Sequence, residues 1–95
     1  MRDSELTAEA YDLLPSHMRE GMRLWMERGI CTGGFLSAVL RNDLMGAMEQ
    51  ADIENLHALP QYGRFLYNYA PHGSFGSREN FAAWRKRGGL SGDAP

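Results

Sequence analysis

Hydrophobic residues along this chain recur every three or four positions in several stretches, and this spacing predicts helices. In the first stretch the apolar side chains stand at steps of four, three and one: Met18, Met22, Trp25 and Met26. They share one face of a helix that we expect from about Pro15 to Arg28, since proline fits the first turn, where its missing N–H has no partner. Gly29 is expected to end this helix in a left-handed conformation.

A shorter helix of about eight or nine residues is predicted next. We expect Thr32 to be its N-cap, with its hydroxyl accepting from a backbone N–H of the first turn. Four apolar side chains would face inward: Phe35, Leu36, Val39 and Leu40. Asn42 suits the left-handed conformation that ends this helix, and Asp43 suits the N-cap of the helix that follows.

The third stretch carries the longest periodic pattern. Its stripe steps by three or four residues throughout: Leu44, Met48, Ala51, Asn55, Leu59, Tyr62, Leu66 and Tyr69. Since the phase is kept across Pro60, the pattern predicts one helix of about 26 residues that is kinked at Pro60 and ended by Pro71. Asn55 falls inside the stripe, and a buried amide needs a partner. We expect that partner to be a backbone carbonyl between the first two helices.

A last helix is predicted after the loop that follows Pro71. Ser77 caps it, Phe81 and Trp84 lie on its inner face, and two glycines at 88 and 89 stop it.

The fold class that follows is all-α, since no segment of useful length alternates polar and apolar residues as a strand would. We expect a single small domain, residues 1–95, with three to four helices packed around one long, Pro-kinked helix. Residues 1–12 and 90–95 are expected to be loosely ordered.

Composition and charge narrow the function classes. The 95 residues make one domain. Ten basic and twelve acidic residues give a net charge of −2, which provides no general attraction to nucleic acid or to an anionic membrane. The single cysteine, Cys31, excludes an intramolecular disulfide and fits a reducing compartment. No apolar stretch approaches the roughly 20 residues that cross a bilayer, and the polar N-terminus does not resemble a signal peptide. We therefore expect a cytoplasmic protein without a membrane partner.

Residues that carry out catalysis or bind metals are scattered along the chain. The three histidines, His17, His57 and His72, form no ligand pair with one another or with Cys31, so we expect no metal and no cofactor. Cys31 has no base placed beside it by the sequence. The glycine pair at 33 and 34 lacks the Lys-Ser/Thr of a phosphate-binding loop and is interpreted as a close approach of two helices. We identify no catalytic residue and expect the protein not to be an enzyme.

A second apolar side accompanies the main stripe of the long predicted helix. At about 100° per residue it lies roughly 90–170° from the main stripe. It consists of Met45, Ile53, Leu56, Pro60 and Tyr67. A helix that is apolar on two sides is either sandwiched inside its own domain or exposes one side to a partner. Met45, Ile53, Leu56 and Tyr67 are therefore candidates for a protein interface.

Charge is distributed unevenly. Four carboxylates and no Lys or Arg lie between Asn42 and Gly63: Asp43, Glu49, Asp52 and Glu54. These acids would repel phosphates if the helix after Asp43 were the recognition helix of a helix-turn-helix, so we do not expect nucleic acid as the main partner. The basic cluster of the last helix keeps nucleic-acid binding open as an alternative: Arg78, Arg85, Lys86 and Arg87.

A longer pattern is similar to small uncharacterised proteins of tailed phages and prophages. The matching segments are His17–Arg23, Glu27–Ile30, Gly33–Leu36, Ala38–Leu40, Asn42–Leu44, Ala51–Asp52, Leu66–Pro71, Gly76–Ser77 and Ala83–Trp84. The likeness covers about residues 13–84, and Cys31 stands where such proteins commonly have proline. The resemblance implies a mobile-element origin and action in the bacterial cytoplasm. It brings no established activity and no functional residues.

Together these observations favour a non-enzymatic protein-binding protein that inhibits or modulates a host defence or nucleic-acid-processing complex, of the anti-CRISPR or anti-restriction type. Steric occlusion is preferred to nucleic-acid mimicry, because the four carboxylates do not form one helix face. The alternatives are a small nucleic-acid-associated protein that uses the basic last helix and a structural or self-assembling phage component that forms a homo-oligomer.

Overall fold

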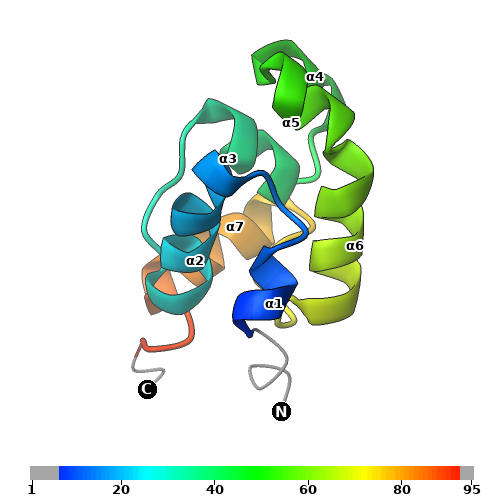
Figure 1. The fold of residues 1–95 in the computed structure, drawn as a ribbon. Helices are drawn as coiled ribbons and strands as arrows, with labels where there is room; N and C mark the ends of the chain where they lie inside the picture. The colour runs from blue at the N-terminus through cyan, green and yellow to red at the C-terminus, as the bar shows by residue number, and fades with distance from the viewer. Residues whose placement is uncertain (1–6, 93–95) are drawn as a thin grey trace.

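The computed structural model describes residues 7–92, and this part of the chain contains helices and no strand (Figure 1). The elements are α1 (Ala8–Tyr11), the 3-10 turn η2 (Ser16–Met18), α2 (Arg19–Arg28), α3 (Gly34–Leu40), α4 (Leu44–Gln50), α5 (Ile53–His57), α6 (Leu59–Tyr69) and α7 (Arg78–Arg87). The predicted all-α class is confirmed.

The first predicted helix is confirmed over η2 and α2. Pro15 precedes η2, and Gly29 ends α2 with a φ of 66°. The apolar face of α2 is fully buried at Met22, Trp25 and Met26. Before it, residues 8–11 form the short helix α1, and residues 1–6 lie outside the described residues.

The caps around α3 follow the prediction in part. Thr32 is not the N-cap, because Gly33 takes that position without a side-chain hydrogen bond. The Thr32 side chain instead lies 2.8 Å from the Ser37 hydroxyl, which donates to the Thr32 carbonyl at 3.0 Å. Asn42 has the predicted left-handed conformation, with a φ of 64°. Asp43 caps α4 as predicted, accepting from the Gly46 N–H at 3.0 Å.

The prediction of one long helix from 44 to 69 is wrong. The chain is extended at Ala51 and Asp52, with ψ of 137° and 176°, so α4 ends and α5 begins there. The Asp52 carboxylate accepts from the Asn55 N–H at 2.7 Å, which favours a new helix start over continuation. A second break falls at Ala58, and Pro60 lies in the first turn of α6 rather than at a kink.

Asn55 is buried, as predicted, but its partner differs. The Tyr62 hydroxyl donates to Asn55 Oδ1 at 2.8 Å, so the amide ties α5 to α6 rather than to the connection between α2 and α3. Ala70 is extended before Pro71, as proline requires of the residue before it, and α6 ends there.

The hydrophobic core takes side chains from α1, α2, α3, α4, α6 and α7, and aromatic residues connect α2 to α7 within it. The Trp25 ring stacks on Phe81 with centroids 4.4 Å apart, and the Trp84 indole N–H donates to the Trp25 carbonyl at 2.9 Å. The Trp25 indole N–H in turn donates to the Ser74 carbonyl at 2.9 Å, which fixes the loop before α7. The predicted cap is present, because Ser77 Oγ accepts from the Asn80 N–H at 3.0 Å.

The segment after α7 folds back onto the end of α2. The Leu90 N–H donates to the Met26 carbonyl at 2.9 Å, and the Ser91 N–H donates to the Glu27 carbonyl at 2.8 Å. Gly89 makes this contact possible: its φ is 72°, and a Cβ there would lie 2.5 Å from the Arg28 nitrogen. Residues 93–95, the rest of the expected loose end, lie outside the described residues.

Figure 1 places α4 and α5 at the top of the molecule and α6 along its right side. The C-terminal ends of α2 and α7 lie together at the lower left, at the opposite end from α4 and α5. The stretch rich in carboxylates and the basic end of α7 are thus at opposite ends of the molecule.

Candidate protein-binding surface

Large apolar side chains are exposed mainly on α4, α5 and α6. Of the six that are exposed within residues 7–92, five lie between positions 44 and 67: Leu44, Met45, Met48, Ile53 and Tyr67. We call these five the α4–α6 face. Met45, Ile53 and Tyr67 are 75%, 72% and 83% exposed, so three of the four interface candidates are open to solvent. Leu56 is only partly exposed. Within the described residues, most of this second apolar side is therefore not covered by other helices of the domain.

A groove of about 220 Å³ opens between the start of α4 and α6. Its lining is mostly apolar and consists of Val39, Asn42, Asp43, Leu44, Ala47, Leu59, Tyr62, Gly63 and Leu66. We call this the α4–α6 groove. Leu44 belongs to both the groove and the α4–α6 face. Tyr67 follows Gly63 by four residues, which places it one helical turn further along the same side of α6.

Gly63 leaves the wall of the groove open. No atom lies within 4 Å of the position that a Cβ would occupy at Gly63. A larger side chain at this position would therefore extend into free space and not into the core. This makes Gly63 a position at which the groove can be filled without disturbing the packing beneath it.

Acidic side chains border the same region. Asp43 lines the groove, and Asp43 and Glu49 flank Met45 and Met48 in a shallow hollow on α4. One Asp43 oxygen accepts from the Gly46 N–H, but neither Asp43 nor Glu49 forms an ion pair with any residue of the described chain. Their negative charges are therefore available to a partner.

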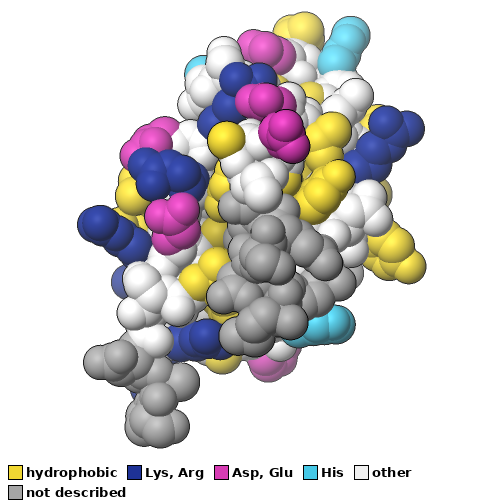
Figure 2. All heavy atoms as spheres, turned by 60° about the horizontal axis from the view of Figure 1, so that its bottom comes forward, with side chains coloured by type: hydrophobic (Ala, Val, Ile, Leu, Met, Phe, Trp, Pro, Cys, Tyr) yellow, Lys and Arg dark blue, Asp and Glu magenta, His cyan; other side chains and the backbone are white. Residues whose placement is uncertain are grey.

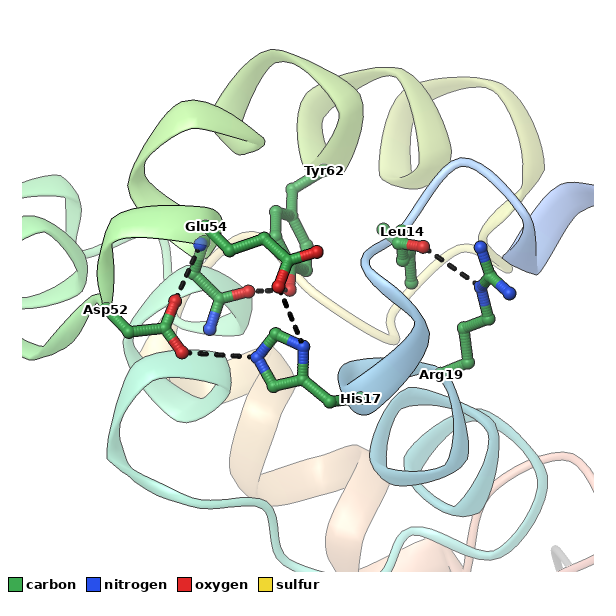
Figure 3. A network of polar contacts seen from close by, with 7 residues as sticks. Leu14, His17, Arg19, Asp52, Glu54 and Tyr62 are labelled. Atoms are coloured by element: carbon green, nitrogen blue, oxygen red, sulfur yellow. Dashed lines mark hydrogen bonds and ion pairs between the residues drawn. The ribbon is translucent and has the colours of Figure 1, made fainter.

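The other two carboxylates of this stretch are engaged with a histidine (Figure 3). His17 Nε2 lies 3.1 Å from Asp52 Oδ2, and His17 Nδ1 lies 3.4 Å from Glu54 Oε1. A protonated imidazole donates to both carboxylates, whereas a neutral one donates to only one of them. The Asn55 N–H, with His17 as a smaller contributor, lowers the pKa of Asp52 below its usual value. This cluster holds η2 against α5 and so positions Ile53, the first residue of α5.

The sequence does not predict the His17 cluster, because His17 and Asp52 are 35 residues apart along the chain. Only the tertiary packing brings them together. The position of Asp52, three residues before Asn55, is a recognisable N-cap signal. Nothing in the sequence indicates that the Asp52 carboxylate also contacts His17.

The remaining residues that carry potential chemistry do not form a site. Within residues 7–92 no three His, Cys, Asp or Glu side chains are arranged to hold a metal ion. His57 and His72 are exposed on separate segments, and so is the free thiol of Cys31. The Tyr11 hydroxyl is buried, and burial together with Glu27 raises its pKa to about 12, which makes it a poor base or nucleophile at neutral pH.

The basic residues of α7 are divided between its two ends. Arg78 opens the helix and Arg85, Lys86 and Arg87 close it, about 10 Å further along the axis. Arg87 lies over the Trp84 ring, 5.0 Å from its centroid. The backbone of Arg28, at the end of α2, lies beside Gly88 and Gly89, which directly follow this second group.

Most basic side chains on α2, in contrast, are balanced locally. Arg23 forms ion pairs with Glu20 at 2.7 Å and with Glu27 at 3.2 Å. Figure 2 shows basic and acidic side chains lying next to one another on the left of its view, on the side of α2. Hydrophobic side chains reach the surface on the right of the same view, on the side of α6.

Comparison with known proteins adds no relative: no family model, no curated protein and no solved structure matches the chain. Among the helices of residues 7–92, none combines the length and the apolar character that crossing a membrane requires.

Proposed function

We propose that this chain is a non-enzymatic protein-binding protein whose partner docks on the α4–α6 face. The observation that carries the proposal is the exposure of Met45, Ile53 and Tyr67 on the three successive helices α4, α5 and α6, of which α4 and α6 also enclose an apolar groove. Exposed apolar side chains that gather on neighbouring elements often mark a site of protein interaction. Methionine adapts its shape to a partner, and tyrosine is enriched in interface cores, so these residue types suit such a surface.

The concrete form of the proposal is an inhibitor or modulator of a host defence or nucleic-acid-processing complex, of the anti-CRISPR or anti-restriction type. The likeness of the sequence to small phage and prophage proteins supports this form. The protein would act in the cytoplasm of a bacterial host by covering a functional surface of that complex. Occlusion remains preferable to mimicry of nucleic acid, because the four carboxylates do not share one face: Asp52 and Glu54 contact His17, Asp43 lines the groove, and Glu49 lies in the neighbouring hollow on α4.

The proposal is tested by affinity capture from a nuclease-treated bacterial lysate, with the captured proteins identified by mass spectrometry. The wild-type protein is compared with the double variant Met45→Ser, Tyr67→Ser. Both side chains are exposed, so these substitutions should change the free energy of unfolding by less than about 0.5 kcal/mol. We expect the wild type to retain one stoichiometric host complex at about 0.5 M salt, because apolar contacts resist screening, and the double variant to lose it.

The matched control is Ile30→Ser. Ile30 is also an exposed apolar residue, at 45%, but it follows α2 and lies outside the α4–α6 face. The Ile30→Ser variant should capture the same complex as the wild type. Equal capture by the double variant, or recovery of the protein alone, would contradict the proposal.

One observation supports the nucleic-acid alternative. Arg28 ends α2 with its backbone beside the glycines that follow Arg85, Lys86 and Arg87, so the ends of α2 and α7 together carry four basic residues. Cations at helix C-termini also stabilise the helix dipoles, so the cluster has a structural role without any ligand. If all four side chains contact duplex phosphates, the logarithm of the binding constant should fall with the logarithm of salt concentration with a slope of about −3.6. A slope near zero, or no binding at about 50 mM salt, would leave only the structural role.

A further inference from the structure

We propose that the occupant of the α4–α6 groove is an amphipathic helix of the partner protein, with an apolar side chain in the groove and Lys or Arg residues facing Asp43 and Glu49. This inference rests on the proposed function and names the chemistry of the partner.

The size of the groove favours a side chain over a small molecule. Its volume is about 220 Å³, whereas pockets that enclose a metabolite or cofactor measure about 300–1,000 Å³. The lining offers five aliphatic side chains and the ring of Tyr62, and its single charged side chain is Asp43. An apolar anchor that projects from a folded element would fill such a space, as the central residues of protein interfaces do.

The shape of the surface favours a helix as the element that carries the anchor. The open side at Gly63 lets a backbone approach α6 closely. Tyr67 continues the apolar surface one turn along α6, and Leu44 and Met48 continue it along α4. Apolar residues repeated at helical spacing on the partner would meet these positions in turn, which is the usual mode of a helix in a groove.

The carboxylates near the groove determine which charged residues the polar face of the partner helix should carry. Asp43 and Glu49 carry no ion pair within the described part of the chain, and the only Lys or Arg between residues 42 and 69 is Arg64. Cations on the partner would therefore be attracted and carboxylates repelled. Basic helices with apolar positions are also elements with which nucleic-acid-binding proteins contact phosphates, so the groove suits the class of host complex proposed above.

The same charges argue against a second copy of this chain as the occupant. Two α4–α6 faces placed against each other would bring the Asp43 and Glu49 carboxylates of both copies together. The basic helix α7 of a second copy is also unsuitable, since its apolar residues Phe81 and Trp84 are buried in its own core.

Two synthetic helical peptides of about 18 residues test the inference. Both carry the same stripe of Leu and Trp at helical spacing, and the polar positions are Lys in one peptide and Glu in the other. Binding of the labelled peptides is measured by fluorescence anisotropy at about 0.15 M salt, near physiological ionic strength. The contact site is located from changes in the amide resonances of the ¹⁵N-labelled protein. We expect the Lys peptide to bind at least tenfold more tightly and to shift the resonances of Ala47, Gly63 and Leu66.

Two variants separate binding in the groove from general attraction between opposite charges. Gly63→Trp fills the groove and should weaken binding of the Lys peptide at least tenfold, whereas Gly63→Ala should not. Asp43→Asn keeps an N-cap residue while removing the charge, so it should reduce the preference for the Lys peptide without unfolding α4. Asp43→Asn therefore tests the inference even if Gly63→Trp fails to fold.

Several results would overturn the inference. These are equal binding of the two peptides, resonance changes that lie outside the groove, and a homodimer that already covers Gly63 in the free protein. If the Lys peptide fails to bind while capture of a host complex still depends on Met45 and Tyr67, this inference fails and the proposed function stands. If capture does not depend on these residues, the proposed function itself is wrong.

Discussion

Replacing Tyr62 with phenylalanine should destabilise the protein by breaking the link between α5 and α6. The Tyr62 hydroxyl donates to Asn55 Oδ1 at 2.8 Å, and the two residues are 1% and 3% exposed. The substitution removes the donor and leaves a buried acceptor, which costs about 1–3 kcal/mol. With a cost of about 2 kcal/mol, the melting temperature of a domain of this size falls by roughly 8–16 °C.

The assay is urea denaturation followed by circular dichroism, applied to the double-mutant cycle of Tyr62→Phe and Asn55→Ala. We expect a coupling energy of at least about 0.5 kcal/mol between the two substitutions. Tyr69→Phe is the control, because the Tyr69 hydroxyl makes no hydrogen bond within residues 7–92 and should cost less than about 0.5 kcal/mol. A cost below about 0.5 kcal/mol for Tyr62→Phe, or a coupling energy near zero, would show that this hydrogen bond does not stabilise the contact between α5 and α6.

Four further predictions follow from the helix contacts and the titrating groups. Gly63→Ala should raise the free energy of unfolding by about 0.5–1 kcal/mol in urea denaturation, since its Cβ meets open space. Gly46→Ala should be less stable than Gly63→Ala, since its Cβ would meet the capping carboxylate of Asp43. Gly89→Ala should lose more than about 1 kcal/mol, since its φ is positive and its Cβ would meet backbone atoms. The pKa of Asp52 is lower in the folded state, so its contribution is present above its unfolded pKa and is lost as the pH falls through the folded value. Asp52→Asn, which keeps a capping residue, should therefore lose less stability than the wild type on acidification, as measured by thermal melts between pH 5 and about 2.

Helix caps and ends could be predicted from the sequence because their chemistry is local. Asp43 and Ser77 each accept from a backbone N–H three residues ahead, at Gly46 and Asn80. Gly29 ends its helix with a positive φ at the position where the apolar spacing stops. Each of these signals lies within a few residues of the feature that it predicts.

The single long helix could not be excluded by periodicity alone. The apolar residues of α4, α5 and α6 keep a helical spacing across the breaks at Ala51 and Ala58. The spacing therefore does not reveal the breaks. The residue that indicates the break is Asp52. Its carboxylate accepts from the Asn55 N–H, and this hydrogen bond competes with the backbone hydrogen bond that the Asn55 N–H would make in a continuous helix. At Thr32 a local signal was misleading: threonine is a good N-cap residue, but its hydroxyl contacts the Ser37 hydroxyl and does not cap α3.

The candidate surface was predicted in part. Spacing identified Met45, Ile53 and Tyr67 as a second apolar side, and the structure leaves them exposed. Binding at these positions stays a prediction. The groove and the His17 cluster depend on how α3, α4 and α6, or η2 and α5, meet in space. No local pattern encodes those contacts.

Site-specific photocrosslinking in bacterial cells would show directly whether the α4–α6 face binds a host protein. A benzoylphenylalanine replaces Tyr67 in one variant and Ile30 in a second. Both positions are exposed, so both probes are accessible to solvent and to partners. If the partner docks on this face, position 67 yields a discrete crosslinked host protein and position 30 yields none. Crosslinks from neither position, or the same proteins from both, would contradict docking on this face.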